Sequence, residues 1–402
     1  MSTKQSALQT FRALLRRPLA SYQIVLGSSA LLLGIGLIMV LSASSVLALN
    51  LYGNAFAIFG RQALFAAIGV AGAYLASRIS IANLRRLSYP LMFIAIFLVA
   101  ITLIPGVGIE VQGNRNWLPL FAGFRLQPSE LAKLALVVWA ADLYARKEQL
   151  LKHPRHVWLP MLPVAAVVIA LIVAQDDLGT ALILFAIALG MLWIAGIPRR
   201  YMVGIGATVA AILVFFVAIA PHRVSRTLNF MDPLSAADTA GYQSVHSMMA
   251  FATGRFFGVG LGASRQKWGT LPEAHTDFIL SVIGEELGLF GTLVILVLFG
   301  FLTYAIIRIA TRAREPFARH AAAGLGVWIM GQAMINIGMV LGLLPVIGVP
   351  LPLLSYGGSS LLVTLIAVGL LLNFAKTEPG AARALAAKKR RRQRARRQVH
   401  KS

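Results

Sequence analysis

Four ionisable side chains gather at the start of one long apolar run in the C-terminal third of the chain. His275 and Asp277 stand at the mouth of this run, and Glu285 and Glu286 lie inside it. Only 14 of the 402 residues are acidic, so the grouping is unusual within this chain. A carboxylate close to hydrocarbon is costly enough to be a functional candidate by default. We therefore predict that Asp277 is a catalytic residue.

A structural alternative exists for the same residues. Thr276 and Asp277 precede an apolar stretch, and both residue types are common at the N-cap of a helix. In that interpretation the carboxylate of Asp277 only satisfies backbone N–H groups at the helix start.

A second group of charges surrounds the start of another apolar run. Arg125 is followed by Pro128, which suits the first turn of a helix, and then by Glu130 and Lys133. Glu130 and Lys133 are three residues apart and therefore share one helix face. Such an intramembrane pair can be purely structural, because each ion lowers the cost of burying the other. Its functional interpretation is a cationic site for a lipid-linked phosphate, with Glu130 holding Lys133 in place.

The composition indicates whether the chain folds in water or in a membrane. Hydrophobic residues make up 58% of the chain, charged residues 13%, and the mean hydropathy is +0.77. Too little polar surface remains to cover a soluble particle of this size, so the chain is predicted to be a polytopic membrane protein. Cysteine is absent, and the seven histidines include no pair four residues apart. A disulfide framework is excluded, and a protein-built zinc centre is not expected.

Ten apolar runs are each about long enough to cross a hydrocarbon core of ~30 Å at ~1.5 Å per helical residue. They lie near residues 23–48, 56–77, 88–105, 128–145, 158–175, 178–196, 201–220, 277–307, 318–344 and 355–375. The first run is too long for a cleaved signal peptide and is interpreted as an uncleaved anchor. The predicted fold is all-α, with ten transmembrane helices and one large extracytoplasmic loop.

Lysine and arginine predict the orientation. With the N-terminus in the cytoplasm, 28 of the 37 basic residues fall in cytoplasmic tails and loops, as the positive-inside rule requires. Both termini then lie in the cytoplasm, and the helices span the cytoplasmic (inner) membrane. The predicted organisation is a cytoplasmic basic tail at 1–22, a ten-helix membrane domain at 23–376 containing the large extracytoplasmic loop 221–276, and a cytoplasmic basic tail at 377–402.

The same asymmetry argues against nucleic acid as a partner for a chain of net charge +23. The basic run 388–397 is expected to be a disordered tail that contacts anionic lipid of the inner leaflet, at about 1 kcal/mol per charge. Docking of another protein on this tail is the alternative.

Several further segments near the predicted outer face are polar or irregular. Asp176 and Asp177 are explained by a turn and an N-cap. The glycines of 258–262 follow no strand, so they predict a hinge beside the membrane rather than a dinucleotide site, and no organic cofactor is expected. Gln332 and Asn336 predict interhelical hydrogen bonds. The irregular backbone of 348–360 must be buried or line a cavity.

Seven segments together resemble the SEDS family (shape, elongation, division and sporulation) over about residues 23–376. They are QPSELAK at 127–133, DLGT at 177–180, GYQ at 241–243, GVGLG at 258–262, PEAHTDFI at 272–279, GEELG at 284–288 and PLPLLSYGGSS at 350–360. EAHTDF and GEELG are closer to the division branch of the family than to its elongation branch. Asp176 departs from the pattern, because the family more often has proline there.

The resemblance implies a peptidoglycan glycosyltransferase that polymerises lipid II with a class B penicillin-binding transpeptidase, beside other division proteins at the division septum. It implies that Asp277 is the essential acid and that Arg125, Glu130 and Lys133 are functional charges. The matching segments also supply Glu273, His275, Ser355 and Tyr356 as substrate-binding candidates. A divalent cation, Mg²⁺ or Mn²⁺, is a candidate cofactor. Asp277 is then either the base that accepts the proton of the acceptor hydroxyl or a ligand of that cation.

Three other functions fit parts of the pattern. A flippase for lipid II would also use intramembrane charges, although neither internal repeats nor broken midplane helices are evident. An elongation-type paralogue would differ only in its cellular role. A scaffold without activity would not need Asp277.

A geometric expectation follows from the length of the run 277–307. Counting back 20 residues from Arg308 crosses the hydrocarbon core and reaches Gly288, so a straight helix would lift Asp277 about 16 Å above it. We therefore predict a strong tilt or a bend near Gly284, Gly288 and Gly291, which would bring Asp277 close to Arg125 and Lys133. Glu285 or Glu286 would then face the interior, toward one of those two basic side chains.

Overall fold

The computed structural model describes residues 17–111, 113–119, 124–219 and 241–387, and it contains all ten predicted membrane helices. They are α2 (Ala20–Tyr52), α3 (Ala57–Ala76), α4 (Ile81–Ile101), α5 (Pro128–Arg146), α6 (Pro154–Val173), α7 (Leu178–Ile194), α8 (Arg199–Ile219), α11 (Ile279–Arg312), α12 (Pro316–Val340) and α13 (Gly358–Ala375). Within the described residues, seven of these helices are long and apolar enough to span a membrane, and α7 is a shorter apolar helix. The predicted class, a helical polytopic membrane protein, is confirmed.

Local sequence explains several helix boundaries. The hydroxyl of Ser80 accepts a hydrogen bond from the backbone N–H of Asn83, which caps the start of α4. Pro128 occupies the first turn of α5, as predicted, where its missing N–H costs nothing. α2 ends where Gly53 takes a left-handed conformation, with φ of 66°.

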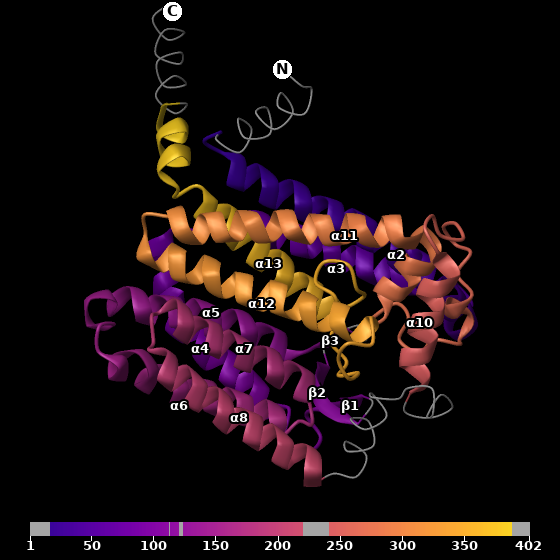
Figure 1. The fold of residues 1–402 in the computed structure, drawn as a ribbon, viewed down its shortest axis with the longest axis horizontal. Helices are drawn as coiled ribbons and strands as arrows, with labels where there is room; N and C mark the ends of the chain where they lie inside the picture. The colour runs from indigo at the N-terminus through magenta and orange to yellow at the C-terminus, as the bar shows by residue number, and fades with distance from the viewer. Residues whose placement is uncertain (1–16, 112, 120–123, 220–240, 388–402) are drawn as a thin grey trace, which may run out of the picture.

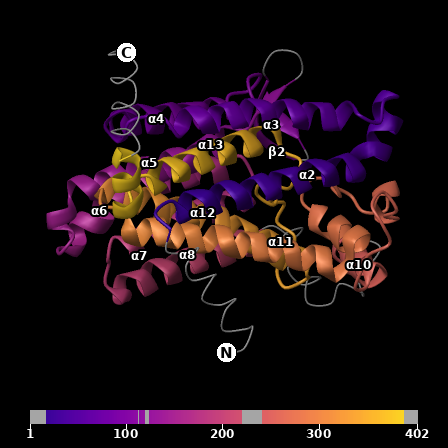
Figure 2. The same ribbon diagram turned by 90° about the horizontal axis from the view of Figure 1, so that it is seen from above.

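The helices pack around α12 and α5. α12 contacts α11, α5 and α7, while α11 lies along α2, as both views show (Figures 1 and 2). α3 packs on α13 and α2, and α4 packs on α5. α5 is buried around most of its circumference, which explains why its charged residues must find partners inside the protein.

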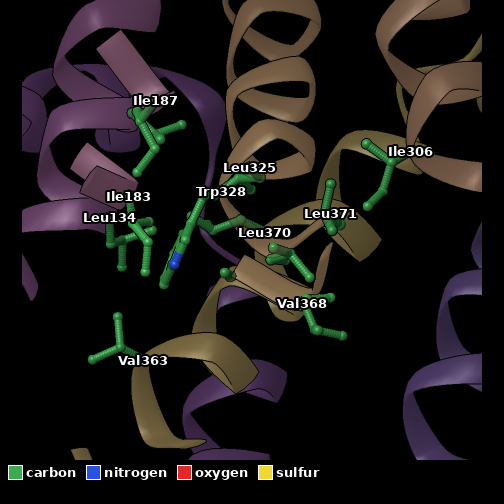
Figure 3. Packing of buried hydrophobic residues seen from close by; sticks show 14 of the residues in the cluster. Leu134, Ile183, Ile187, Ile306, Leu325, Trp328, Val363, Val368, Leu370 and Leu371 are labelled. Atoms are coloured by element: carbon green, nitrogen blue, oxygen red, sulfur yellow. The ribbon is translucent and has the colours of Figure 1, made fainter. Parts of the chain in front are cut away.

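The apolar core between these helices is continuous. Trp328 of α12 lies near Leu134 of α5 and Ile183 of α7 in Figure 3, and its side chain is almost completely buried. In a membrane the lipid tails are as apolar as these side chains, so close van der Waals packing rather than the hydrophobic effect favours such contacts.

The two ends of the described chain lie at the same end of the bundle. The Lys376 ammonium lies 5.7 Å from the centre of the Tyr22 ring, and Arg308 pairs with Glu378 at 3.6 Å. We call this the tail end. We call the opposite end the cavity end, because the cavity described below opens there. α2 and α12 end at the cavity end, and α3, α5, α7, α11 and α13 begin there. An even number of crossings agrees with the prediction that both termini share one side.

A small antiparallel sheet between α4 and α5 was not predicted. Its strands, in the order β1-β2-β3, are β1 (Ile109–Val111), β2 (Asn114–Pro119) and β3 (Arg125–Leu126). Gly113, with φ of 84°, supplies the left-handed turn residue between the first two strands. The all-α expectation is therefore corrected by one sheet, which carries Arg125 to the cavity end.

α11 bends where the sequence predicted. Gly288 interrupts the helix with φ of 69° and ψ of −164°. The interruption frees carbonyl groups upstream, and Glu285 and Glu286 accept backbone hydrogen bonds from Val259 (2.9 Å) and Gly260 (3.0 Å). The segment predicted as a hinge is thus fastened to the bend of α11.

The segment before α11 contains α10 (Tyr242–Gly254) and a 3₁₀ turn, η3 (Gln266–Trp268). A second 3₁₀ turn, η2 (Glu148–Leu150), follows α5. Residues 379–387 are helical. Residues 221–240 of the predicted large loop and the basic run 388–397 lie outside the described residues, so the lipid contact of that run stays a prediction.

We predict that Gly288→Ala destabilises the protein. A methyl group there would lie 2.4 Å from the backbone nitrogen of Gly258, and the φ of 69° strains any other residue by about 1–3 kcal/mol. The matched control is Gly300→Ala in the same helix, where an added methyl group meets nothing within 4 Å. Thermal unfolding in detergent should show a lower midpoint for Gly288→Ala only. Equal midpoints would show that the bend tolerates a side chain.

Candidate functional site

A cavity of about 420 Å³ opens at the cavity end. Six of the eight predicted site residues line it, namely Arg125, Glu130, Lys133, Glu273, Asp277 and Tyr356. They come from β3, α5, the segment before α11 and the segment before α13. Residues more than 200 positions apart in sequence therefore share one cavity, which Asp277 lines together with the α5 charges.

Asp277 does not cap a helix. α11 begins at Ile279, and its N-cap, Phe278, makes no side-chain capping bond. The alternative interpretation of Asp277 as an N-cap is therefore wrong. The carboxylate instead lines the cavity, with Oδ2 3.5 Å from the position that a methyl group on Gly348 would take.

The surroundings of Asp277 disfavour its charged form. Burial, followed by the negative charges of Glu273 and Asp177, raises the pKa of the Asp277 carboxyl to about 7. A carboxyl group with such a pKa exchanges a proton readily near neutral pH.

The charge pair of α5 is buried and fully oriented. Lys133 is 1% exposed, and its ammonium donates to Oε1 of Glu130 at 2.8 Å and to Oε1 of Gln332 at 2.9 Å. It also lies 5.4 Å from the centre of the Trp328 ring. Because the cost of burying this cation is offset by several partners, its position at the cavity wall is fixed.

Two amides of α12 hold the segment that carries the site. Asn336 donates to the carbonyl oxygens of Asp277 and Val349, both at 2.7 Å. Gln332 donates to the carbonyl oxygen of Pro350 at 2.9 Å. The predicted hydrogen bonding by these amides thus reaches irregular backbone rather than side chains of a neighbouring helix, apart from the bond to Lys133. Irregular backbone at membrane depth needs such internal donors.

Asp177 connects three elements at the wall of the cavity. Its carboxylate caps α7 by accepting from the Thr180 N–H at 3.0 Å, as predicted. It also accepts from Asn116 of β2 at 2.8 Å and from Gln127 at 3.2 Å. The preceding Asp176 has φ of 63°, which proline cannot adopt. The proline that the family more often has at this position would therefore not fit this backbone conformation.

Two predicted binding residues, His275 and Ser355, are not among the side chains that line the cavity. The carbonyl of His275 accepts from the N–H of Tyr356 at 2.9 Å, and the two rings lie 5.3 Å apart. The Ser355 hydroxyl accepts from the N–H of Leu351 at 2.8 Å. Both residues therefore support Tyr356 and the loop around it. Burial lowers the pKa of His275, although the charge of Glu273 acts in the other direction.

Sequence reasoning missed three cavity residues on α2 and α3, namely Tyr52, Arg61 and Phe65. The Arg61 guanidinium lies 5.3 Å from the centre of the Tyr52 ring. Burial raises the pKa of Tyr356, and the nearby Arg61 charge opposes that rise. One signal was available, because Arg61 is among the nine basic residues that the charge asymmetry leaves outside the predicted cytoplasmic segments.

Glu285 and Glu286 are buried, as predicted, but they do not face Arg125 or Lys133. Glu286 pairs with Lys267 at 3.3 Å and accepts from the Ser42 hydroxyl at 2.7 Å. Glu285 accepts from the Ser264 hydroxyl at 2.5 Å. Their predicted partners are corrected for a physical reason: the bend at Gly288 exposes this part of α11 to the loop 258–268, which supplies closer donors.

Among the residues that the structure describes, no three His, Asp or Glu side chains gather into a metal site. Asp277 and Glu273 nevertheless both line the cavity. These two carboxylates fit a cation that takes only part of its oxygen ligands from the protein, as Mg²⁺ commonly does.

The fold and the cavity together define a polytopic membrane protein with a charged site at one end of its helix bundle. The profile of the family described as "Cell cycle protein", which covers FtsW, RodA and SpoVE, matches residues 23–379. The chain belongs to this family, the SEDS family that its motifs resemble.

Curated relatives agree with this assignment. The chain is 43% identical over 377 residues to the probable peptidoglycan glycosyltransferase FtsW of Mycobacterium tuberculosis, covering 94% of this chain and 72% of the relative. It is 41% identical over 363 residues to the protein of the same name from Trichlorobacter lovleyi, covering 90% and 95%. The predicted likeness to the division branch is confirmed.

Solved structures share the fold. A chain described under "Structural coordination of polymerization and crosslinking by a peptidoglycan synthase complex" has a TM-score of 0.69 and 28% identity, covering 88% of this chain and 96% of that one. The rod shape determining protein RodA of Thermus thermophilus has a TM-score of 0.63 and 26% identity, covering 88% and 97%.

We predict that Asn336→Leu lowers stability because it leaves the carbonyl oxygens of Asp277 and Val349 without their donor. Each buried unpaired acceptor costs about 1–3 kcal/mol. The matched control on the same helix is Met334→Leu, whose side chain is 69% exposed. The midpoint of thermal unfolding should be lower for Asn336→Leu than for Met334→Leu. If both melt with the wild type, the Asn336 amide does not hold the segment.

Proposed function

We propose that this chain is a peptidoglycan glycosyltransferase that polymerises lipid II at the outer face of the cytoplasmic membrane during cell division. The observation that carries the proposal is the shared cavity, which Asp277 lines together with the cations Arg125 and Lys133. The curated relatives carry the name of this activity, and the family assignment supports it.

The proposed reaction is a single displacement with inversion. A sugar hydroxyl of the acceptor forms a bond to the anomeric carbon of the donor, and the bond from that carbon to the lipid pyrophosphate breaks. The hydroxyl proton passes to the carboxylate of Asp277, and the bonding electrons leave with the pyrophosphate. Asp277 therefore acts as the general base, a role for which a pKa of about 7 is well matched.

Positive charge must stabilise the departing pyrophosphate. Arg125 has an exposed side chain on the cavity wall and can approach the phosphates. Lys133 is held rigidly by Glu130 and Gln332, so its charge is in place before the reaction. In this assignment Glu130 orients Lys133, whereas Glu273 contacts the sugars and Tyr356 contacts the sugars or the pyrophosphate. His275 and Ser355 are assigned the support of Tyr356.

We further propose a divalent cation, Mg²⁺ or Mn²⁺, which Glu273 would hold in the cavity while Asp277 stays free to act as the base. When bound, it would neutralise charge on the leaving group. Electron paramagnetic resonance of Mn²⁺ added to the full chain with undecaprenyl pyrophosphate should report binding that Glu273→Gln weakens. Identical spectra for both proteins would remove Glu273 from the ligand set.

The proposed orientation places the tail end in the cytoplasm. Arg85, Arg146, Arg308 and Arg319 lie in helices or loops at that end, as the positive-inside rule requires of cytoplasmic segments. The cavity then faces the outside, where lipid II is polymerised, at the division septum. A class B penicillin-binding transpeptidase is the proposed partner, together with other division proteins. The similarity to a chain of a peptidoglycan synthase complex supports that pairing.

The direct test is Asp277→Asn in the purified full chain with its class B transpeptidase, using lipid II as substrate. Loss of a general base typically costs 10²–10⁴-fold in rate, so we expect at least about 100-fold slower polymerisation with an unchanged melting temperature. Asp176→Asn is the matched control, because Asp176 is exposed and does not line the cavity. Glycan of normal length and yield from Asp277→Asn would end the catalytic assignment.

The pH dependence gives a second test. Because the base must be ionised, the rate should fall as the pH drops through the Asp277 pKa of about 7. The charge of Glu273 contributes to raising that pKa, so Glu273→Gln should move the acidic limb of the rate profile to lower pH. The measurement is kcat/KM for lipid II across the neutral range. A limb that stays in place, or moves upward, contradicts the proposed coupling.

A further inference from the structure

A second hollow lies beside the bend of α11, apart from the catalytic cavity. It is an open groove of about 950 Å³ between the end of α10 and the following loop. No residue lines both this groove and the cavity that contains Asp277. Its wall combines apolar side chains, Met249, Phe256 and Phe257, with two arginines, Arg255 and Arg265.

The aromatic residues of this groove are strongly exposed. Phe257 is 87% exposed and Phe256 is 69% exposed. Adjacent exposed aromatic rings are rare on surfaces that face water alone, and they indicate a contact with a membrane or a partner.

The depth of the groove identifies the apolar medium around it. Its loop is attached to α11 at the bend, because the N–H groups of Leu289 and Phe290 donate to the carbonyl oxygens of Arg255 (2.9 Å) and Phe256 (3.1 Å). Helix geometry places the bend at Gly288 about 30 Å from Arg308, since 20 residues rise ~1.5 Å each. This distance equals the thickness of the hydrocarbon core. The groove therefore lies at the level of the lipid headgroups.

The exposed face of α11 continues the apolar surface of the groove toward the tail end. Phe290, Leu293 and Val297 all have exposed side chains there. Acyl chains that cover this face of α11 in a bilayer would reach the groove without interruption.

The charge of the groove is positive. Arg255 and Arg265 are exposed, and neither forms an ion pair with a carboxylate in the part of the chain that the structure describes. The sequence contains no Asp or Glu from residue 241 to residue 272. Arg255 also has a left-handed φ of 48°, which costs about 1–3 kcal/mol for a residue other than glycine. Two arginines at headgroup depth match the chemistry of a phosphate group.

The groove is preformed rather than flexible. The backbone N–H of Arg265 donates to the Glu285 carboxylate at 3.0 Å, and Lys267 is paired with Glu286. These buried carboxylates of α11 hold the loop, so a ligand would not have to order it first.

We propose that this groove is a binding site for an anionic glycerophospholipid of the bilayer. Arg255 and Arg265 bind its phosphate, while Phe256, Phe257 and the exposed face of α11 contact its acyl chains. The pyrophosphate of a polyprenyl lipid shares part of this chemistry, but the groove is separate from the cavity where that substrate reacts.

The test is native mass spectrometry of the full-length protein, titrated with phosphatidylglycerol and, separately, with phosphatidylcholine. The double substitution Arg255→Gln with Arg265→Gln should weaken binding of one phosphatidylglycerol molecule about tenfold and leave phosphatidylcholine binding unchanged. Arg115→Gln is the matched control, because Arg115 is another exposed arginine at the cavity end and does not line the groove. Phe257→Ser is a second variant, expected to weaken phosphatidylglycerol binding without changing the melting temperature.

Three outcomes would overturn the proposal. The first is equal loss of phosphatidylglycerol from the double variant and from Arg115→Gln. The second is displacement of phosphatidylglycerol by undecaprenyl pyrophosphate at equal concentration, which would assign the groove to the polymerisation substrate. The third is stoichiometric displacement of phosphatidylglycerol by the transpeptidase, which would make the groove a protein interface. Retention of phosphatidylglycerol in both competitions, with loss only in the groove variants, supports the proposal.

Discussion

The need to satisfy irregular backbone at membrane depth shapes the whole cavity end. Lipid offers no hydrogen-bond partners, so every break in a helix must find them within the protein. The segment before α13 receives them from Gln332 and Asn336 of α12. The bend in α11 receives them from Val259 and Gly260 of the preceding loop. The segment before α13 lines the cavity that contains Asp277, whereas the bend of α11 holds the loop 258–268.

The buried charged residues of α5 must also find their partners within the protein. At the cavity end Lys133 is paired with Glu130, and at the tail end Asp142 accepts from Arg85 and Arg146, each at 2.7 Å. The buried Asp142 joins α4 to α5, whereas Lys133 joins α5 to α12 through Gln332. The central helix is therefore held at both ends by polar contacts, which are directional in a way that apolar packing is not.

Apolar length and glycine position were enough to predict the ten helices and the bend at Gly288. The segment 107–126 was not assigned a structure from sequence, because its strands are short and their pairing depends on contacts with Asp177 that lie far away in the chain. Asp277 illustrates the limit of local rules. Its residue type suits an N-cap, but Asn336 holds the backbone of Asp277 two residues before the helix begins at Ile279, and Phe278 takes the N-cap position. The partners of Glu286 depended on a loop whose path only the tertiary structure defines.

The spacing of Gln332 and Asn336 has a consequence for the geometry of the site. The first amide accepts from the ammonium of Lys133, and the second holds the backbone of Asp277. Four residues of helix separate them, a rise of about 6 Å along α12. α12 thus contacts the Lys133 ammonium at Gln332 and the backbone of Asp277 at Asn336, one helical turn farther along. Because both amides belong to one helix, a change in the position of α12 would alter the contact to Lys133 and the contact to the Asp277 backbone at the same time.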